Sequence, residues 1–298
     1  MMQLQSIGLN ARIIINSKGE LGCANVVWLG DETTGCIIDF CLTREMAFEA
    51  KLFLQEQNCK FDLGLASHNH VDHLGGAASF FPLPLYGTSL VAETCQKMAS
   101  VPELIPCLLR LFNINGHADI PSLEDISNLD NLPSGVVSKE FKRAHSTSDI
   151  VLINPLGVGA LGDLCATTVA PLLRHSDPLL WLSALDDLLE LNIEVVLPGH
   201  GEPGNSLDLK HTYQYIYQIL EEASQLAELW DSKIPTGLVT VARGGKADVA
   251  DSTYYSAVDR VAATAIQFGW NESNRSGLNI AAAICNILGI QLNPKPIT

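Results

Sequence analysis

Short apolar runs separated by polar turns fill the first part of the chain and predict β-strands. Residues 11–16, 24–29 and 35–40 each have the pattern of one strand in a β-meander, and a polar turn at 31–35 separates the second strand from the third. Residues 43–57 then have the pattern of a helix that begins from its threonine N-cap. The chain therefore opens as a sheet followed by a helix.

Strand-like and helix-like patterns continue along the rest of the chain. Strands are predicted at 61–67, 150–153, 159–162 and 193–197, and helices at 178–191, 207–230, 254–268 and 278–288. Residues 89–131 interrupt this alternation with Pro-punctuated apolar stretches, which predict a helical insert. Segment 236–251 is Gly-rich, and Arg243-Gly244-Gly245-Lys246 is its only basic spot.

Four side chains that can bind a metal stand within the six-residue run His-Asn-His-Val-Asp-His at 68–73. Three imidazoles beside a carboxylate would repel one another on protonation unless a cation held them, and Zn, Fe and Mn favour this ligand set. The run lies where a predicted strand passes into a tightly packed helix, which is predicted to begin at Leu74. Strand alternation points positions 68, 70 and 72 to one side, and His73 turns away. The run can therefore serve two metals, with His68 and His70 on one and Asp72 and His73 on the other.

The run resembles the H-x-H-x-D-H signature of the metallo-β-lactamase superfamily. Later motifs stand in the order that this resemblance requires: His145 before one predicted strand, then Asp163 and His200 after two others. The matching motifs run from about residue 20 to 205, roughly two thirds of the chain. The resemblance implies two ions, one bound by His68, His70 and His145, the other by Asp72, His73 and His200, with Asp163 bridging the pair.

Three departures from relatives narrow the expected activity. Residues 143–148 read Arg-Ala-His-Ser-Thr-Ser where many relatives have Pro-Gly-His-Thr-Pro-Gly, so this loop lacks their glycines. Asp163 stands where most β-lactamases of the superfamily carry cysteine or serine, whereas glyoxalase II-like thioesterases, lactonases and phosphodiesterases carry a bridging aspartate. His70 stands where the flavodiiron oxygen reductases carry glutamate, which argues against that group.

The resemblance implies a metal-dependent hydrolase. We expect a dinuclear site, most simply with zinc (iron and manganese remain open), whose metal-bridging hydroxide attacks a carboxylic ester, lactone or thioester. Asp72 is the expected catalytic residue, orienting the nucleophile and moving its proton. The alternatives are a mononuclear iron oxidoreductase of the persulfide dioxygenase type, β-lactamase or phosphodiesterase activity, and a catalytically silent binding protein.

Four further residues have two interpretations each. Asp39 ends the third predicted strand, where relatives hold an aspartate that supports the metal loop, and the alternative is an acid in solvent. His175 lies where it could overlook the cleft, behind the ligands or against the substrate. Cys165 either approaches the metals or packs as a small buried residue, and His117 is either a metal ligand or, as we expect, a residue of a surface loop.

Composition indicates which partners and which cellular compartment to expect for the protein. The chain has 298 residues, with 18 Lys and Arg against 33 Asp and Glu, a formal net charge of −15. Such an acidic chain is a poor nucleic-acid binder, so we expect a small-molecule substrate. The eight cysteines are scattered, and we see no secretory signal or membrane span, which favours a cytoplasmic protein. Apolar helices near the C-terminus favour a homodimer.

The expected fold is α/β, a four-layer αββα sandwich of two mixed sheets with helices outside and metals at one edge. We place the main domain at 1–235, with its helical insert at about 89–131, and a helical C-terminal extension at 236–298. The apolar insert either covers the cleft or packs on the body. The extension is expected to pack on the main domain, where it could also form a dimer contact or complete the pocket.

Overall fold

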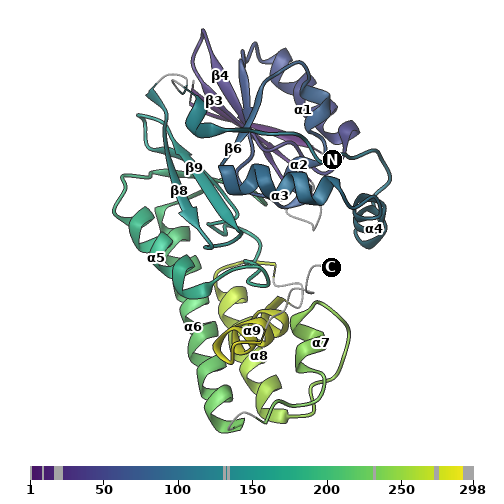
Figure 1. The fold of residues 1–298 in the computed structure, drawn as a ribbon. Helices are drawn as coiled ribbons and strands as arrows, with labels where there is room; N and C mark the ends of the chain where they lie inside the picture. The colour runs from purple at the N-terminus through teal and green to yellow at the C-terminus, as the bar shows by residue number, and fades with distance from the viewer. Residues whose placement is uncertain are drawn as a thin grey trace.

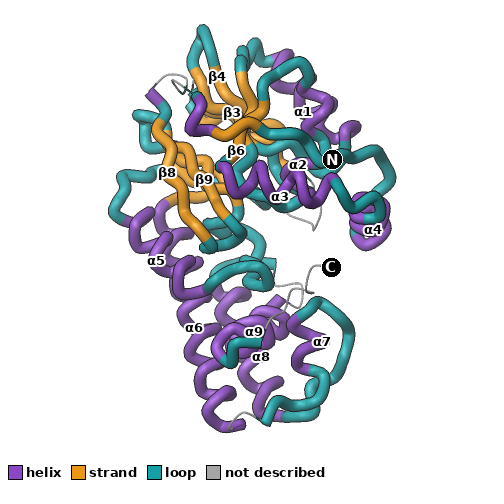
Figure 2. The backbone as a smooth tube through the Cα atoms, viewed as in Figure 1, coloured by secondary structure: helices purple, strands orange, loops and turns teal. Residues whose placement is uncertain are grey.

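A computed structural model shows two β-sheets in the middle of the molecule with helices outside them (Figure 1, Figure 2). It describes residues 2–8, 10–16, 23–129, 132, 135–230, 233–271 and 275–290. Residues 130 and 131 of the expected insert, and 272–274 and 291–298 of the expected extension, lie outside the described residues.

The first sheet contains the predicted meander. Within the described residues it has seven strands in chain order, antiparallel from β1 to β4 and parallel from β4 to β7. The pattern did not predict β1, because none of its side chains is fully buried and it lacks an apolar run. The strands are β1 (Gln3–Ile7), β2 (Ala11–Ile15), β3 (Val26–Gly30), β4 (Gly35–Ile38), β5 (Leu63–Leu65), β6 (Leu85–Gly87) and β7 (Glu124–Asp125).

The second sheet is built from the C-terminal half of the main domain. Its strands, among the residues described, lie in the order β12-β11-β10-β9-β8. Among these described strands, β10 and β11 pair in parallel and the other neighbours pair antiparallel. The strands are β8 (Val137–Lys142), β9 (Ser148–Ile153), β10 (Val158–Gly162), β11 (Val195–Pro198) and β12 (Gly204–Asn205).

The long helices lie where the sequence predicts them. The side chains of Thr43 and Asp177 cap α1 and α5 by accepting hydrogen bonds from backbone N–H groups in the first turn. The pattern missed the short α7 in the Gly-rich segment. The helices are α1 (Arg44–Glu56), α2 (Val71–Leu74), α3 (Ser89–Ala99), α4 (Leu104–Leu111), α5 (Pro178–Leu189), α6 (Ser206–Trp230), α7 (Leu238–Ala242), α8 (Ser252–Gln267) and α9 (Arg275–Ile287), with the 3₁₀ turns η2 (Ala77–Phe80) and η3 (Ile126–Asn128).

The helix after the histidine run differs from the expectation. We expected a packed helix beginning at Leu74, but α2 ends there and η2 follows. A Cβ atom on Gly75 would lie 2.0 Å from the carbonyl oxygen of Leu42, and one on Gly76 would lie 2.3 Å from that of Phe40. The two glycines therefore let the turn pack against the backbone after β4, which holds the histidine run close to the first sheet.

Three apolar layers hold the sandwich together. One fills the space between the sheets, with Ile13 and Leu65 facing Leu152 and Leu197. A second lies between the first sheet and helices α1 and α3. The third lies between the second sheet and helices α5 and α6 and continues into α8 and α9. This arrangement confirms the four-layer αββα sandwich.

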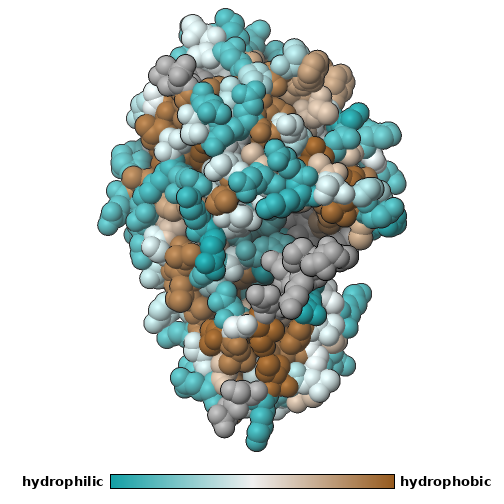
Figure 3. Space-filling model, in the orientation of Figure 1, coloured by the Kyte–Doolittle hydropathy of each residue, from teal (hydrophilic) through white to brown (hydrophobic). Residues whose placement is uncertain are grey.

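The C-terminal helices share the third core layer with the main domain. Tyr215, Ile216 and Ile219 of α6 are fully buried in it together with Ile280 and Ile284 of α9. Hydrophobic residues are gathered over α8 and α9 on one face of the molecule (Figure 3). None of the helices in the described part of the chain combines the length and the apolar character needed to cross a bilayer.

Candidate metal centre

The topology brings the predicted ligands to one edge of the sandwich. The carboxyl ends of parallel neighbouring strands meet at the same edge, so the loop after β5 lies beside Asp39, which follows β4. In the second sheet, Asp163 follows β10 and His200 follows its parallel neighbour β11. His145 precedes β9, which is antiparallel to β10, so it begins at that edge too.

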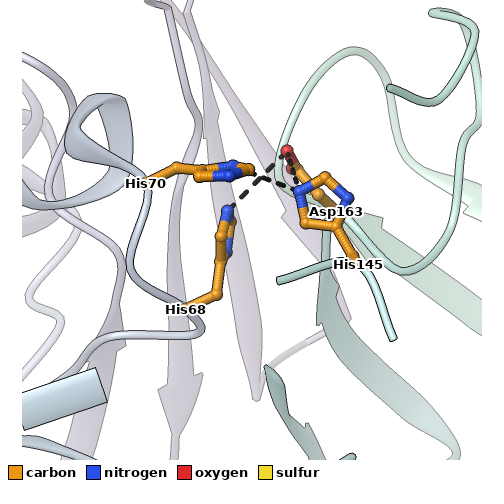
Figure 4. A group of neighbouring side chains, drawn as sticks. All are labelled: His68, His70, His145 and Asp163. Atoms are coloured by element: carbon orange, nitrogen blue, oxygen red, sulfur yellow. Dashed lines mark hydrogen bonds and ion pairs between the residues drawn. The ribbon is translucent and has the colours of Figure 1, made fainter. Parts of the chain in front are cut away.

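One group of four donors gathers between the two sheets. Ligand atoms of His68, His70, His145 and Asp163 all lie within 4.8 Å of one another. In Figure 4 the two histidines from the first sheet point toward the histidine and aspartate from the second. His70 Nδ1 lies 3.2 Å from His145 Nε2, which in turn lies 3.4 Å from Asp163 Oδ2.

A second group lies beside the first. Ligand atoms of Asp72, His73 and His200 also lie within 4.8 Å of one another. His200 Nε2 is 3.2 Å from Asp72 Oδ2 and 3.3 Å from His73 Nε2. Asp163 reaches this group as well, with Oδ1 3.5 Å from His73 Nε2. The structure therefore brings together all seven predicted ligands, and one carboxylate touches both groups.

Donor spacing and unpartnered atoms fit a metal. Two nitrogens on one tetrahedral zinc, each about 2.0–2.1 Å from it, lie about 3.3 Å apart, close to the separations of the His70–His145 and His73–His200 pairs. His68 Nε2 and Asp163 Oδ1 are buried without a hydrogen-bond partner. Buried polar atoms are costly to leave unpaired, and a cation would satisfy them.

The charge state of the cluster suits a cation. Burial, reinforced by the neighbouring His73 and His70, holds the pKa of His68 well below its usual range, so this imidazole is neutral. Burial alone would raise the pKa of Asp163, but His200 and His73 hold it well below its usual range. Neutral imidazole and ionised carboxylate are the forms that bind metals.

Asp39 and Ser67 fix which ring nitrogens face the cluster. Asp39 accepts hydrogen bonds from Ser67 Oγ and His73 Nδ1, each at 2.8 Å, and from the Ser67 backbone N–H at 2.8 Å. Ser67 Oγ can then accept from His68 Nδ1, at 2.9 Å. When these two rings are neutral, with the proton on Nδ1, it is Nε2 of His68 and of His73 that presents a lone pair to the cluster. The structure thus gives Asp39 the position expected of a supporting residue.

His175 lies against the cluster at the other side. Its Nδ1 is 3.1 Å from His70 Nε2, while His70 Nδ1 faces His145. Partial loss of solvent around the ring, together with the neighbouring His70 and Arg174, lowers the pKa of His175 to about 3. His175 therefore overlooks the site as expected, and it contacts a predicted ligand.

Two other candidates lie elsewhere. Cys165 is buried beside Thr212, with Sγ 3.8 Å from Thr212 Oγ1, which supports the packing interpretation. His117 is exposed and bonded to Glu45, with Nδ1 2.6 Å from Oε1. It is the surface residue that the sequence suggested.

Asp149 was missed by the sequence reasoning, although it orders the His145 loop. Its Oδ2 accepts hydrogen bonds from the backbone N–H groups of His145, at 3.1 Å, and Ser146, at 2.9 Å. This buried carboxylate holds a loop that lacks the glycines of its relatives. An aspartate shortly after a turn serine is the local signal that could have revealed it.

Asn25 and Gly199 were also missed, because their partners are distant in sequence. Asn25 Nδ2 donates to the carbonyl oxygens of Pro198, at 3.0 Å, and Gly201, at 2.9 Å, and so holds the turn that carries His200. A Cβ atom on Gly199 would lie 2.1 Å from Asp163 Oδ1. Glycine is therefore required where this turn passes the bridging carboxylate.

Replacing Asp149 with alanine is expected to lower the free energy of unfolding by about 1–3 kcal/mol, because two buried N–H groups lose their acceptor. The loosened His145 loop should also weaken metal binding. Urea denaturation and metal titration measure the two effects. The matched control is Asp186→Ala, which removes an exposed acid of α5. Equal stability of the two variants would contradict the role given to Asp149.

A single thiol should react under native conditions. Cys107 is exposed and the other cysteines are buried. Burial raises the pKa of Cys36 to about 12 and that of Cys95 to about 12, which suppresses the reactive thiolate. Mass spectrometry after brief iodoacetamide treatment should find one added group, absent from Cys107→Ser. Rapid modification of a second cysteine would contradict the packing described.

Comparison with known proteins identifies the fold. No family model matches the sequence, and no curated protein matches it. Among solved structures, TMB-1 has a TM-score of 0.56 at 14% identity, covering 73% of this chain and 97% of that chain. The DIM-1 metallo-β-lactamase has a TM-score of 0.54 at 14% identity, covering 72% and 97%.

A metallo-β-lactamase from Pontibacter korlensis is similar to the same extent, with a TM-score of 0.54 at 16% identity, covering 73% of this chain and 99% of that chain. The chain therefore has the metallo-β-lactamase fold, as its motifs led us to expect. Each match also leaves more than a quarter of this chain without a counterpart.

Proposed function

We propose that this chain is a dinuclear metal-dependent hydrolase that acts on a carboxylic ester, a lactone or a thioester. The metal-dependent hydrolases of this fold are its structural neighbours. One observation carries the proposal furthest: Asp163 lies within 3.4 Å of His145 on one side and within 3.5 Å of His73 on the other. A carboxylate so placed can bridge two ions and set their separation.

Each half of the site has its own ligands in this proposal. His68, His70 and His145 would hold the first ion, while Asp72, His73 and His200 would hold the second. Zinc is the metal we propose, because histidine and carboxylate donors at these spacings suit its tetrahedral geometry. Iron and manganese accept the same donor types.

The ions, when bound, polarise the scissile carbonyl and lower the pKa of water toward about 7, which yields hydroxide. The protein's own contribution is orientation and proton transfer. Asp72 can accept a hydrogen bond from the attacking water, align it, and carry its proton toward the leaving group. A hydrogen bond with His200 and the neighbouring imidazoles of His73 and His200 outweigh burial and hold the pKa of Asp72 below its usual range, so the carboxylate is available as an acceptor.

β-Lactam hydrolysis is the second candidate, favoured by the activity that the names of the similar structures state. Asp163 argues against it, since most β-lactamases of the superfamily carry cysteine or serine there. A phosphodiesterase, an iron-dependent persulfide dioxygenase and a silent binding protein remain as outcomes of the same experiment.

Elemental analysis of the purified protein, followed by a hydrolysis panel, tests the proposal. We expect about two zinc ions per chain and activity on an ester, lactone or thioester that is lost on chelation and restored by zinc. One iron per chain with persulfide oxidation would support the dioxygenase. Absence of bound metal, or turnover of β-lactams or phosphodiesters alone, would overturn the proposal.

Composition and exposed apolar residues support proposals for the substrate class, the cellular location and the oligomeric state. A net charge of −15 supports a small-molecule substrate over nucleic acid. We keep the cytoplasm as its proposed location. Tyr255 and Ile266 of α8 and Ile287 of α9 are exposed, and these apolar side chains support a homodimer.

A further inference from the structure

His70 presents a different ring nitrogen to the cluster from the other histidines of the run at 68–73. The first and last histidines of the run have partners at Nδ1 and present Nε2 to the cluster. His70 is turned the other way, with Nδ1 3.2 Å from His145 Nε2 inside the first ligand group. Its other ring nitrogen, Nε2, lies 3.1 Å from His175 Nδ1.

This geometry decides where the protons stand on the two rings. A neutral imidazole has one lone pair and one N–H group, and the lone pair is what binds a metal. When His70 offers the lone pair of Nδ1 to the first ion, its proton is on Nε2, which donates to His175 Nδ1. The proton of His175 is then on its own Nε2. A hydrogen bond of this kind fixes the orientation of a ligand ring and raises its basicity.

His70 depends more on such a partner than its neighbours do. His68 and His73 are fully buried, so the surrounding side chains already restrict their rings. The His70 ring is only partly buried. Fewer neighbours hold a partly buried ring, so the contact with His175 contributes a larger share of its orientation.

His175 stands on a turn that is tied down on its C-terminal side. The backbone N–H and the hydroxyl of Ser176 both donate to the carbonyl oxygen of Leu173, at 3.1 and 2.8 Å, which closes the turn around His175. Asp177 N then donates to the carbonyl oxygen of Arg143 at 3.0 Å. The turn is therefore attached to the loop that carries the third histidine of the first ligand group.

The N-terminal side of the turn is held by the C-terminal extension. Asn279 of α9 is fully buried; its Oδ1 accepts a hydrogen bond from Leu173 N at 2.9 Å, and its Nδ2 donates to Pro171 O at 2.8 Å. Asn271 N donates to Thr168 O at 2.8 Å in the same stretch of chain. The path of the backbone into the turn therefore depends on residues of the extension.

We propose that His175 is a positioning residue of the metal centre, which holds His70 with Nδ1 toward the first ion, and that the extension holds His175 in place through Asn279. This inference rests on the proposed function, through its metal binding alone. The extension then serves the site without supplying a ligand, and residues outside the two sheets set the affinity for one ion.

Asparagine and leucine at position 175 separate hydrogen bonding from packing, because both side chains branch at Cγ in the same way. His175→Leu should raise one of the two zinc dissociation constants about ten- to hundredfold and leave the other within about twofold. In His175→Asn the amide oxygen stands where Nδ1 stands in histidine and can accept from His70, so both constants should stay within about threefold. Competition against a chelator of known zinc affinity measures them.

Nitrogen-15 NMR of the zinc-loaded protein gives a readout that a loss of packing alone does not move. His70 should carry its proton on Nε2, and zinc should shift the resonance of its Nδ1. That proton should exchange with water about fivefold faster or more in His175→Leu than in the unmodified protein. His175→Asn should restore the slow exchange.

A double-mutant cycle with Asn279→Ala tests the extension. Alone, this variant should raise the same zinc dissociation constant about three- to tenfold, because the turn loses the acceptor for Leu173 N. In His175→Leu protein it should change that constant by less than about twofold, because no contact remains to be positioned. Asn279→Ser makes the same change with a smaller loss of volume, so the cycle does not depend on one variant folding.

The matched control is Asn154→Ala, at a buried asparagine far from the site. Asn154 Oδ1 accepts hydrogen bonds from the backbone N–H groups of Leu156 and Val158, each at 3.0 Å, between β9 and β10. Since Asp163 follows the other end of β10, this turn lies at the opposite edge of the sheet. The control should lose stability and keep both zinc dissociation constants.

The outcomes separate the two parts of the proposal from the hydrolase function. Unchanged zinc affinity in His175→Leu, or equal losses in His175→Leu and His175→Asn, would overturn the role of His175. A loss in Asn279→Ala that persists in His175→Leu protein would overturn the role of the extension. Two bound zinc ions without turnover of any ester, lactone or thioester would refute the hydrolase alone, whereas unmodified protein that binds no zinc would refute both.

Discussion

Replacing Asp163 with alanine is expected to lower the zinc content from about two ions per chain to about one or fewer. Its carboxylate is the group that approaches both ligand sets, at 3.4 Å from His145 Nε2 and 3.5 Å from His73 Nε2. Without it, the two ligand sets no longer share a carboxylate, and the repulsion between two neighbouring cations is no longer offset by its negative charge. Mass-spectrometric metal analysis after dialysis against buffered zinc measures the change.

Two variants sharpen this experiment. His200→Ala removes a donor of the second set alone, so it should retain one ion more firmly than Asp163→Ala does. Asp186→Ala removes an exposed acid of α5 and should leave the zinc content unchanged. A zinc content near two per chain in Asp163→Ala would show that the carboxylate does not bridge.

Replacing Asp72 with asparagine should lower kcat about 10²- to 10⁴-fold at saturating zinc, with a much smaller change in KM. The amide has nearly the same shape and can still offer an oxygen, but it cannot take a proton from the attacking water. Steady-state kinetics on the best substrate of the hydrolysis panel measures the effect.

The zinc content of Asp72→Asn must be measured in parallel, because Asp72 lies 3.2 Å from His200 Nε2 and is also a proposed ligand. A loss of activity that extra zinc restores would mean that the residue serves only as a ligand. Full activity of Asp72→Asn or Asp72→Ala would contradict its catalytic role. Asp186→Asn is the control for an added amide.

The sequence best predicts those features that depend on residues close together along the chain. Four metal-capable side chains in the run at 68–73 reveal the first half of the site without any tertiary information. Thr43 and Asp177 cap their helices through hydrogen bonds to N–H groups three residues ahead. The resemblance then supplied His145 and the other distant ligands, which spacing alone does not select.

Features set by distant contacts were out of reach. The early end of α2 follows from the approach of Gly75 to the Leu42 backbone, and no local pattern describes that approach. Asn25 holds the His200 turn from another sheet, and an isolated asparagine before a strand has many explanations. Helix α7 was not predicted because it lies in a Gly-rich segment, and strand β1 was not predicted because none of its side chains is fully buried. The division of the chain at residue 235 stays a prediction, because α6 and α9 share one core.

The ligands of the metal centre come from both sheets, since His68 and His70 follow β5 of the first sheet while His145 and Asp163 flank β9 and β10 of the second. A cation bound by ligands from both sheets would link the two sheets at this edge of the sandwich. Ligand binding to the native state stabilises it by about 4 kcal/mol at a thousand times the dissociation constant. Resistance to heat and to proteolysis should then increase with the concentration of free zinc. A shortage of zinc would therefore shorten the lifetime of the protein in addition to removing its activity.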